Sequence, residues 1–219
     1  QMCIRDRSKK DLEDVPPMAI QRDSGNNWPF FYGSNIAVDE VRKCKQAYFA
    51  CISFVDAQIG RIVDAIERND LIDDTLIVVW SDHGYFLGEK GLWYKRKNFE
   101  RSLRVPLIIA GGGISAQTQA CSQIVELVDL YPTIVDHAGY KVPQVLEGVS
   151  LVPLLNDPLA DWDKPAISQV IHSRGEAYGF SLRTDRWRYT EWKRGEAGRE
   201  LYDHANDPDE VTNLAGYPE

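Results

Sequence analysis

Two short segments made almost wholly of apolar residues place the strongest constraint on how this chain can fold. Thr75–Trp80 reads TLIVVW and Val105–Ala110 reads VPLIIA, and turn-forming residues flank both. A run this short and rich in β-branched residues is typical of a strand buried on both faces, as in a parallel sheet covered by helices. The two segments therefore predict an α/β fold. The length of 219 residues and the hydrophobic content of 43 % allow a sizeable core.

Helical periodicity around these strands supports the same fold class. Apolar residues recur at spacings of three and four between Val38 and Arg68, which predicts a long helix. A second helix is predicted over Ser122–Ala138, in which Pro132 either lies in the first turn or bends the helix, because proline has no backbone N–H to donate. Strands that alternate with helices are the organisation of α/β proteins.

The pattern changes near residue 160, where a polar stretch between two prolines precedes four segments of alternating polar and apolar residues. Alternation favours antiparallel strands with one exposed face. We therefore expect an α/β core part over 9–160 and a small antiparallel sheet subdomain over 165–219. The expected strands are Ala166–Val170, Ala177–Arg183, Trp187–Trp192 and Glu200–Tyr202.

Charge and composition exclude several classes of function. The net charge of −8 and the isoelectric point of about 5.1 argue against nucleic acid as the main partner, because binding phosphates needs a basic surface. No apolar run approaches the roughly 18 residues of a membrane-spanning helix. The first eight residues, QMCIRDRS, have neither a helix cap nor a periodic pattern, and we interpret them as a non-native scar.

The four cysteines do not form a zinc or redox module, because no two of them make a CxxC pair. Cys44 and Cys51 are two turns apart on the predicted helix, about 10 Å, which is too far for a disulfide with each other. Both are expected to be small core residues. The disulfide state of these two and of Cys121 stays open, and Cys3 lies in the suspected scar.

The segment Ser81–Gly84 (SDHG) is the first candidate for chemistry, because it directly follows the first predicted strand. In open α/β sheets, ligands bind at the carboxyl ends of strands. The Asp82 carboxylate and the His83 imidazole could converge on a divalent cation, with Gly84 permitting the turn. In the alternative, Asp82 caps the next segment and His83 makes a local hydrogen bond.

The residues around this motif resemble the type I sulfatase family. The run 80–113, WSDHGYFLGEKGLWYKRKNFERSLRVPLIIAGGG, is similar to the C-terminal metal-and-sulfate segment of that family. It is most similar to the iduronate-2-sulfatase group, with DHG, LGE-x-G-x-W-x-K, an NF pair and a VPL strand in order. Stretches at 48–60, 146–155, 181–192 and 200–214 extend the resemblance. It implies a partial alkaline-phosphatase-like sandwich core followed by a small antiparallel sheet.

The resemblance also implies roles for individual residues. Asp82 and His83 match two ligands of the family's divalent ion, usually calcium, with magnesium as the alternative, and Lys95 matches the lysine that contacts the sulfate. Tyr85 and Trp93 could line the mouth of a sugar site, although a structural role explains them equally well. The other histidines, His137, His172 and His204, are interpreted as ordinary polar residues.

The nucleophile motif of the family, C/S-x-P/A-x-R, has no match here; Cys3, for example, is followed by Ile-Arg-Asp-Arg. The resemblance therefore implies the C-terminal half of a sulfuric ester hydrolase whose formylglycine lies in a missing N-terminal part. It implies a sulfated sugar of the uronate 2-sulfate type as substrate, and a periplasmic, secreted or lysosomal location. A phosphodiesterase or phosphonate monoester hydrolase of the same superfamily, or a non-catalytic module, is the alternative.

We expect that the chain alone neither hydrolyses sulfate esters nor binds calcium tightly. The nucleophile is absent, and two protein ligands fall far short of the about 6–8 oxygens that calcium takes. Assay of the purified chain with 4-methylumbelliferyl sulfate, with calorimetric titration of calcium, checks both parts. Turnover above the buffer rate would contradict the prediction.

Overall fold

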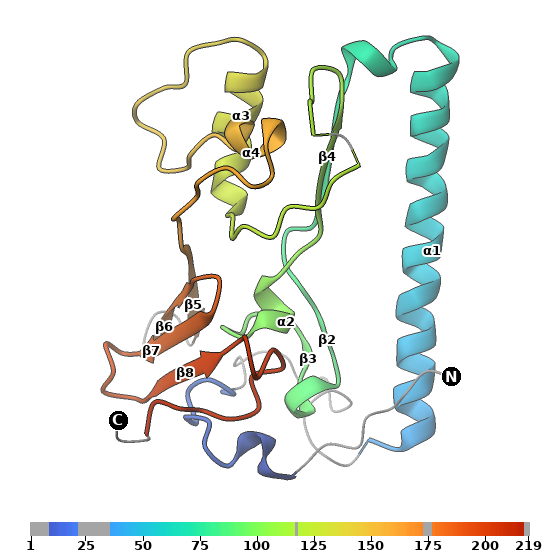
Figure 1. Ribbon diagram of the computed structural model, residues 1–219. Helices are drawn as coiled ribbons and strands as arrows, with labels where there is room; N and C mark the ends of the chain where they lie inside the picture. The colour runs from blue at the N-terminus through green and yellow to red at the C-terminus, as the bar shows by residue number, and fades with distance from the viewer. Residues whose placement is uncertain (1–8, 22–35, 117, 173–176, 217–219) are drawn as a thin grey trace. The chain divides into compact units, whose positions relative to one another are not determined.

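The computed structural model describes residues 9–21, 36–116, 118–172 and 177–216 of the chain, so the suspected scar lies outside the described residues. The protein is mixed α/β, with its elements shown in Figure 1. Its contacts divide it into two compact units. The first contains the described residues of 1–44, 83–105 and 165–219, and the second contains those of 45–82 and 106–164.

The long helix α1 spans Val38–Arg68, as the periodicity predicted, and most of it belongs to the second unit. Asp39 and Glu40 stand in its first turn and Arg68 in its last, which suits the helix dipole. No residue of α1 is buried, and its apolar side chains Phe49, Ile52 and Ile62 are 49 %, 48 % and 62 % exposed. No described helix is long and apolar enough to cross a membrane.

The accessibility of the cysteines of α1 follows from the exposure of the helix. Cys44 is half-buried and Cys51 is exposed, so the expectation that both are core residues was wrong. The apolar face that carries them is half-buried or exposed throughout. Both are free thiols, as is the exposed Cys121.

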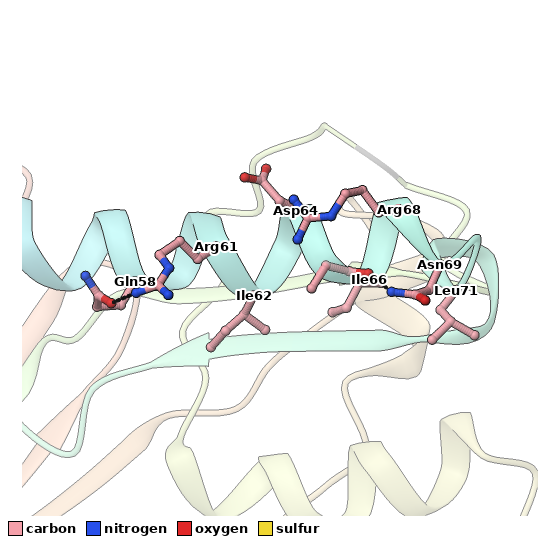
Figure 2. A pocket seen from close by; sticks show the side chains of 9 residues that line it. Gln58, Arg61, Ile62, Asp64, Ile66, Arg68, Asn69 and Leu71 are labelled. Carbon is pink, nitrogen blue, oxygen red and sulfur yellow. Dashed lines mark hydrogen bonds between the residues drawn. The ribbon is translucent and has the colours of Figure 1, made fainter.

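The C-terminal end of α1 carries a shallow hollow, shown in Figure 2. Ile62 and Ile66 lie on one side of the helix there, and Asp64 and Arg68 lie on the other. None of the residues predicted to bind metal, sulfate or sugar lines this hollow. It is therefore not the candidate site.

The two apolar strands of the second unit are β1 (Leu76–Trp80) and β4 (Leu107–Gly111). They form an antiparallel pair, with Leu76 opposite Gly111 and Trp80 opposite Leu107. The expectation of parallel strands buried on both faces was wrong, since every residue of the pair is half-buried or exposed. An apolar run looks the same in either direction, so its composition cannot determine strand direction.

The predicted second helix begins later than expected. A short turn of 3-10 helix, η4 (Leu127–Asp129), leads into α3 (Leu130–His137), with Pro132 in the first turn, which is one of the two predicted alternatives. The Asp129 carboxylate explains the start, because it accepts hydrogen bonds from the N–H groups of Glu126 (2.9 Å) and Val149 (2.8 Å). The remaining helical elements of this unit are η2 (Ile72–Asp74) and α4 (Val152–Asn156).

The first unit is built on a four-stranded antiparallel sheet in the order β5-β6-β7-β8, which confirms the predicted sheet. In β7, Arg188, Thr190 and Trp192 are buried while Trp187 and Tyr189 are exposed. The alternation in the sequence therefore reflects a sheet with one buried face and one exposed face. The strands are β5 (Ala166–His172), β6 (Ala177–Arg183), β7 (Trp187–Trp192) and β8 (Arg199–Asp203). The shorter elements are η1 (Lys9–Leu12), β2 (Phe86–Leu87), η3 (Glu89–Gly91), β3 (Trp93–Tyr94) and α2 (Glu100–Leu103).

The core of this unit joins residues that are far apart in the sequence. Phe99 makes edge-on or tilted ring contacts with Phe86 and Tyr202, each at 6.3 Å between centroids. Val15 and Ala19 pack into the same cluster, although their segment has no periodic pattern. A turn is present in this segment, where the Ala19 N–H donates to the Pro16 carbonyl at 2.9 Å.

Polar contacts anchor the same N-terminal segment. The Asn213 backbone N–H donates to the Asp14 carboxylate at 2.7 Å, and the Asn213 side chain donates to the Asp14 carbonyl at 2.9 Å. The buried Lys90 ammonium donates to Asp11 at 2.8 Å and also to the Glu210 carbonyl. The segment is therefore an integral part of the first unit rather than a loose connection.

A carboxyl group lies inside this core. Glu200 is 1 % exposed and accepts hydrogen bonds from the Trp192 indole at 2.7 Å and the Tyr202 hydroxyl at 2.9 Å. Burial raises the pKa of Glu200 to about 7, because the charged form loses its hydration, and the two donors offset only part of that loss.

The raised pKa of Glu200 predicts that stability falls as pH rises. The ordinary value is 4.5, so between pH 4.5 and 7 the folded state keeps a proton that the unfolded chain has lost. Glu200 then opposes folding progressively, by on the order of 3 kcal/mol at full ionisation. Glu200→Gln should flatten this decline. Urea unfolding of both proteins between pH 4.5 and 7.5 measures it, and parallel pH profiles would contradict the assignment.

Candidate metal and sulfate site

The last two residues of the SDHG segment, His83 and Gly84, are held by a close approach of two backbones within the first unit. The Gly84 N–H donates to the Ser102 carbonyl of α2 at 2.8 Å. A Cβ at Gly84 would overlap the carbonyl oxygens of Arg101 and Arg104. Gly84 does not have a positive φ, so it is the lack of a side chain, rather than left-handed backbone, that this position requires.

This anchored turn orients the half-buried His83 imidazole. Its Nδ1 lies 2.8 Å from the Gly84 carbonyl oxygen, and since a carbonyl can only accept, Nδ1 carries the hydrogen. Nε2 therefore has a lone pair. The Lys95 ammonium, which can only donate, lies 2.5 Å from Nε2. The structure thus brings together His83 and Lys95, which sequence analysis had assigned to metal and sulfate.

A short hairpin carries Lys95 to this position. Strands β2 and β3 pair antiparallel, and the Glu89 carboxylate accepts a hydrogen bond from the Leu87 N–H at 2.7 Å inside the connection. Tyr94 and Arg96, on either side of Lys95, have φ values of 72° and 68°. Two left-handed residues in a row of three are costly for side chains of this size and commonly mark functional loops.

Asp82 is exposed and belongs with β1 to the second unit, whereas His83 belongs to the first. The joint action of Asp82 and His83 on one ion stays a prediction. The donor chemistry fits a divalent cation, because a carboxylate oxygen and an imidazole Nε2 are both good ligands. A metal-binding histidine usually donates its other N–H to a carbonyl or carboxylate, as His83 does to Gly84.

The two aromatic candidates differ in accessibility. Tyr85 is half-buried, and its ring meets that of Tyr94 edge-on at 5.8 Å. Trp93 is 5 % exposed, and its indole lies over Gly88, where an added Cβ would come within 3.3 Å of the ring. Burial favours the structural interpretation of Trp93 and leaves Tyr85 the better candidate for contact with a sugar.

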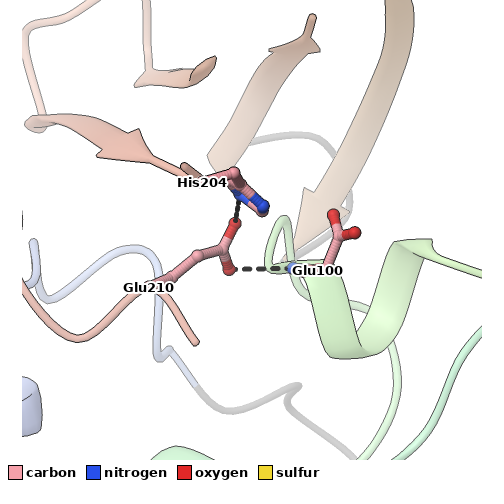
Figure 3. A group of neighbouring side chains, drawn as sticks. All are labelled: Glu100, His204 and Glu210. Atoms are coloured by element: carbon pink, nitrogen blue, oxygen red, sulfur yellow. Dashed lines mark hydrogen bonds and ion pairs between the residues drawn. The ribbon is translucent and has the colours of Figure 1, made fainter. Parts of the chain in front are cut away.

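A second group of potential ligands lies under the sheet of the first unit, where Glu100, His204 and Glu210 place ligand atoms within 4.8 Å of one another (Figure 3). Glu210 accepts from His204 at 3.0 Å and from the Glu100 backbone N–H at 2.8 Å. From the sequence, His204 was interpreted as an ordinary polar residue. The two glutamates could not be predicted to join it, because positions 100 and 210 share no local pattern.

Arginine, rather than a metal, balances this cluster. The buried Arg188 guanidinium donates to Glu210 at 2.6 Å and to Glu100 at 2.5 Å. Burial pushes the pKa of Glu100 upward, but Arg188 and Arg183 outweigh it and hold that pKa below its ordinary value. The carboxylates are thus already paired with cations, and we assign the cluster to structure.

Comparison with known proteins identifies the family. The family model described as Sulfatase matches residues 15–140, and the one described as N-sulphoglucosamine sulphohydrolase, C-terminal, matches residues 88–219. Choline-sulfatase from Rhizobium meliloti is 37 % identical over 84 % of this chain and 35 % of its own length. Human arylsulfatase K is 36 % identical over 80 % of this chain and 34 % of its own. The chain spans about a third of the length of these relatives.

Two solved structures show the same fold. BT4656, in complex with its substrate D-glucosamine-2-N,6-O-disulfate, has a TM-score of 0.72 and 34 % identity over 78 % of this chain and 36 % of its own. A phosphonate monoester hydrolase from Silicibacter pomeroyi has a TM-score of 0.65 and 30 % identity over 75 % of this chain and 35 % of its own.

These relatives are described as choline-sulfatase and arylsulfatase K, so the particular resemblance to iduronate-2-sulfatases is not confirmed. The alkaline-phosphatase-like α/β fold with a four-stranded C-terminal sheet is confirmed. With each family model covering more than half of its length, the chain belongs to the sulfatase family.

Proposed function

We propose that this chain is the C-terminal part of a sulfuric ester hydrolase, in which Asp82 and His83 bind a divalent cation and Lys95 contacts the sulfate. The observation that carries the proposal is the 2.5 Å approach of Lys95 to His83, inside the segment that the Sulfatase family model covers. A metal ligand and an anion-binding ammonium need to be neighbours if both act on one sulfate group.

Each residue has a distinct part in this function. When bound, the cation, calcium or magnesium, would polarise the sulfate oxygens. Asp82 would supply a hard oxygen ligand, and His83 would supply Nε2, held in direction by its hydrogen bond to Gly84. Lys95, on a flexible stem, would neutralise charge on the sulfate as the ester bond breaks. The nucleophile, a formylglycine, would come from an N-terminal part of the protein.

The proposed substrate is a sulfated sugar. BT4656, which was solved with a disulfated glucosamine, supports a sugar, whereas the choline-sulfatase relative acts on a different sulfate ester by its name. A uronate 2-sulfate is our specific proposal, with Tyr85 offering a ring face to the sugar. A periplasmic, secreted or lysosomal location would suit glycosaminoglycan degradation.

The second candidate is hydrolysis of phosphonate monoesters or phosphodiesters. The phosphonate monoester hydrolase from Silicibacter pomeroyi favours it, because its identity to this chain is close to that of BT4656. The same cation, imidazole and ammonium would suit a tetrahedral phosphorus centre. Side-by-side assay of a sulfate ester and a phenylphosphonate ester distinguishes the two functions.

The test uses the complete coding sequence that contains this chain, expressed with a formylglycine-generating enzyme. We expect cation-dependent hydrolysis of 4-methylumbelliferyl sulfate and of sulfated disaccharides. Asp82→Ala and Lys95→Ala should each lower kcat/KM by at least about 100-fold, because each removes a group that stabilises developing charge.

Matched controls are Asp161→Ala and Lys141→Ala, which remove the same side chains at exposed positions away from the SDHG segment. Activity that Asp82→Ala and Lys95→Ala leave within a fewfold of these controls would contradict the assigned roles. Activity on the phosphonate ester alone would favour the second candidate.

A further inference from the structure

The nitrogen of His83 that the proposed function assigns to a cation is in contact with another cation, the ammonium of Lys95. The distance from Lys95 Nζ to His83 Nε2 is 2.5 Å, a short hydrogen bond whose donor carries a charge. Neutral imidazole has one lone pair available for donors or metals, and Nδ1 already donates to Gly84. The ammonium and a metal ion therefore cannot both occupy Nε2.

The histidine is the fixed partner in this contact. Its Nδ1 hydrogen bond to Gly84 sets the plane of the ring, and the N–H of Gly84 is bound to Ser102 at 2.8 Å. The carbonyl oxygens of Arg101 and Arg104 leave no space for the Gly84 turn to shift toward α2. A metal that approaches Nε2 thus meets an imidazole that is already oriented.

The lysine is the movable partner. Lys95 is exposed, and its four-carbon stem can carry the ammonium over several ångströms. Its backbone, by contrast, is held between the left-handed residues Tyr94 and Arg96, and the Arg96 guanidinium donates to the Ile171 carbonyl of β5 at 3.2 Å. Replacement of the ammonium by a metal ion at Nε2 therefore requires a new rotamer of the Lys95 side chain and no movement of the hairpin.

We propose that Lys95 is a placeholder ligand, which occupies His83 Nε2 in the cation-free protein and is displaced when a divalent cation binds. The released ammonium, repelled by the cation, becomes available to an anion such as sulfate. Cation and anion binding are then coupled: each makes the other more favourable, by the same factor in both directions. This inference rests on the proposed function, to which it adds an order of events.

The test is a titration of the 219-residue chain with Mn²⁺ at constant pH, followed by NMR of ¹⁵N-labelled histidine side chains. Mn²⁺ broadens signals near its site even when binding is weak, and His83→Gln assigns the resonance. We expect Lys95→Met to lower the Mn²⁺ concentration for half-broadening of His83 by about tenfold or more, because the metal no longer displaces a charge-assisted hydrogen bond. Lys95→Gln provides a second variant, and backbone amide spectra verify that each variant folds.

Two controls isolate displacement from general charge effects. Arg104→Gln removes one positive charge from an 80 % exposed side chain whose backbone carbonyl lies close to Gly84, and it should change the midpoint by less than twofold. His204, whose carboxylate neighbours are paired with Arg188, should stay sharp throughout. In the unmodified chain, addition of Ca²⁺ should move the ¹⁵Nζ resonance of Lys95 toward those of solvent-exposed lysines.

The outcomes separate this inference from the proposed function. Equal midpoints for the unmodified chain and Lys95→Met, with His83 broadened in both, would overturn displacement and leave the metal role of His83 intact. Equal tightening by Lys95→Met and Arg104→Gln would replace displacement by simple repulsion. No broadening of His83 in any variant would overturn the inference together with the metal role.

Discussion

The first unit depends on how it balances charge that is removed from water. Arg188, Glu210 and Lys90 are all at most 3 % exposed, and a buried charge without a partner is strongly destabilising. Arg188 satisfies Glu100, Glu210 and Ser181 at once, and Lys90 binds Asp11 and the Glu210 carbonyl. These contacts link α2, the sheet, the N-terminal segment and the C-terminal loop. Loss of any one partner would therefore leave a buried charge with fewer hydrogen bonds.

Periodic elements were the predictable part of the fold. Helix α1 and the four strands of the C-terminal sheet each have one face that differs from the other, so a local pattern reveals them. The direction of β1 and β4 was not predictable in this way, because both faces of each strand are apolar. Nor was the burial of Val15, Ala19 and Glu200, which depends on partners that are distant in the sequence.

The same difference between local pattern and distant contact decides which parts of the candidate site could be predicted. The position of Asp82 and His83 after a strand suggested a metal from residue chemistry alone, whereas Lys95 came only from family resemblance. No spacing rule brings residues 83 and 95 together; that requires the hairpin of β2 and β3 and the left-handed residues beside Lys95. Trp93 and Tyr85 looked alike as aromatic residues near the motif, and only the packing of Trp93 against Gly88 separates them.

The contacts of the N-terminal segment have a consequence for the order of folding. Asp14 binds Asn213 across 199 positions of sequence, and Lys90 binds the Glu210 carbonyl across 120. Contacts of such long range make folding slow, since the entropy of closing large loops must be lost before they form. During synthesis the ribosome must release β8 and the loop after it before the segment that carries Asp14 can settle. Until then Phe86, Phe99 and the hairpin that holds Lys95 lack part of their covering, so this face would need protection from aggregation late in translation.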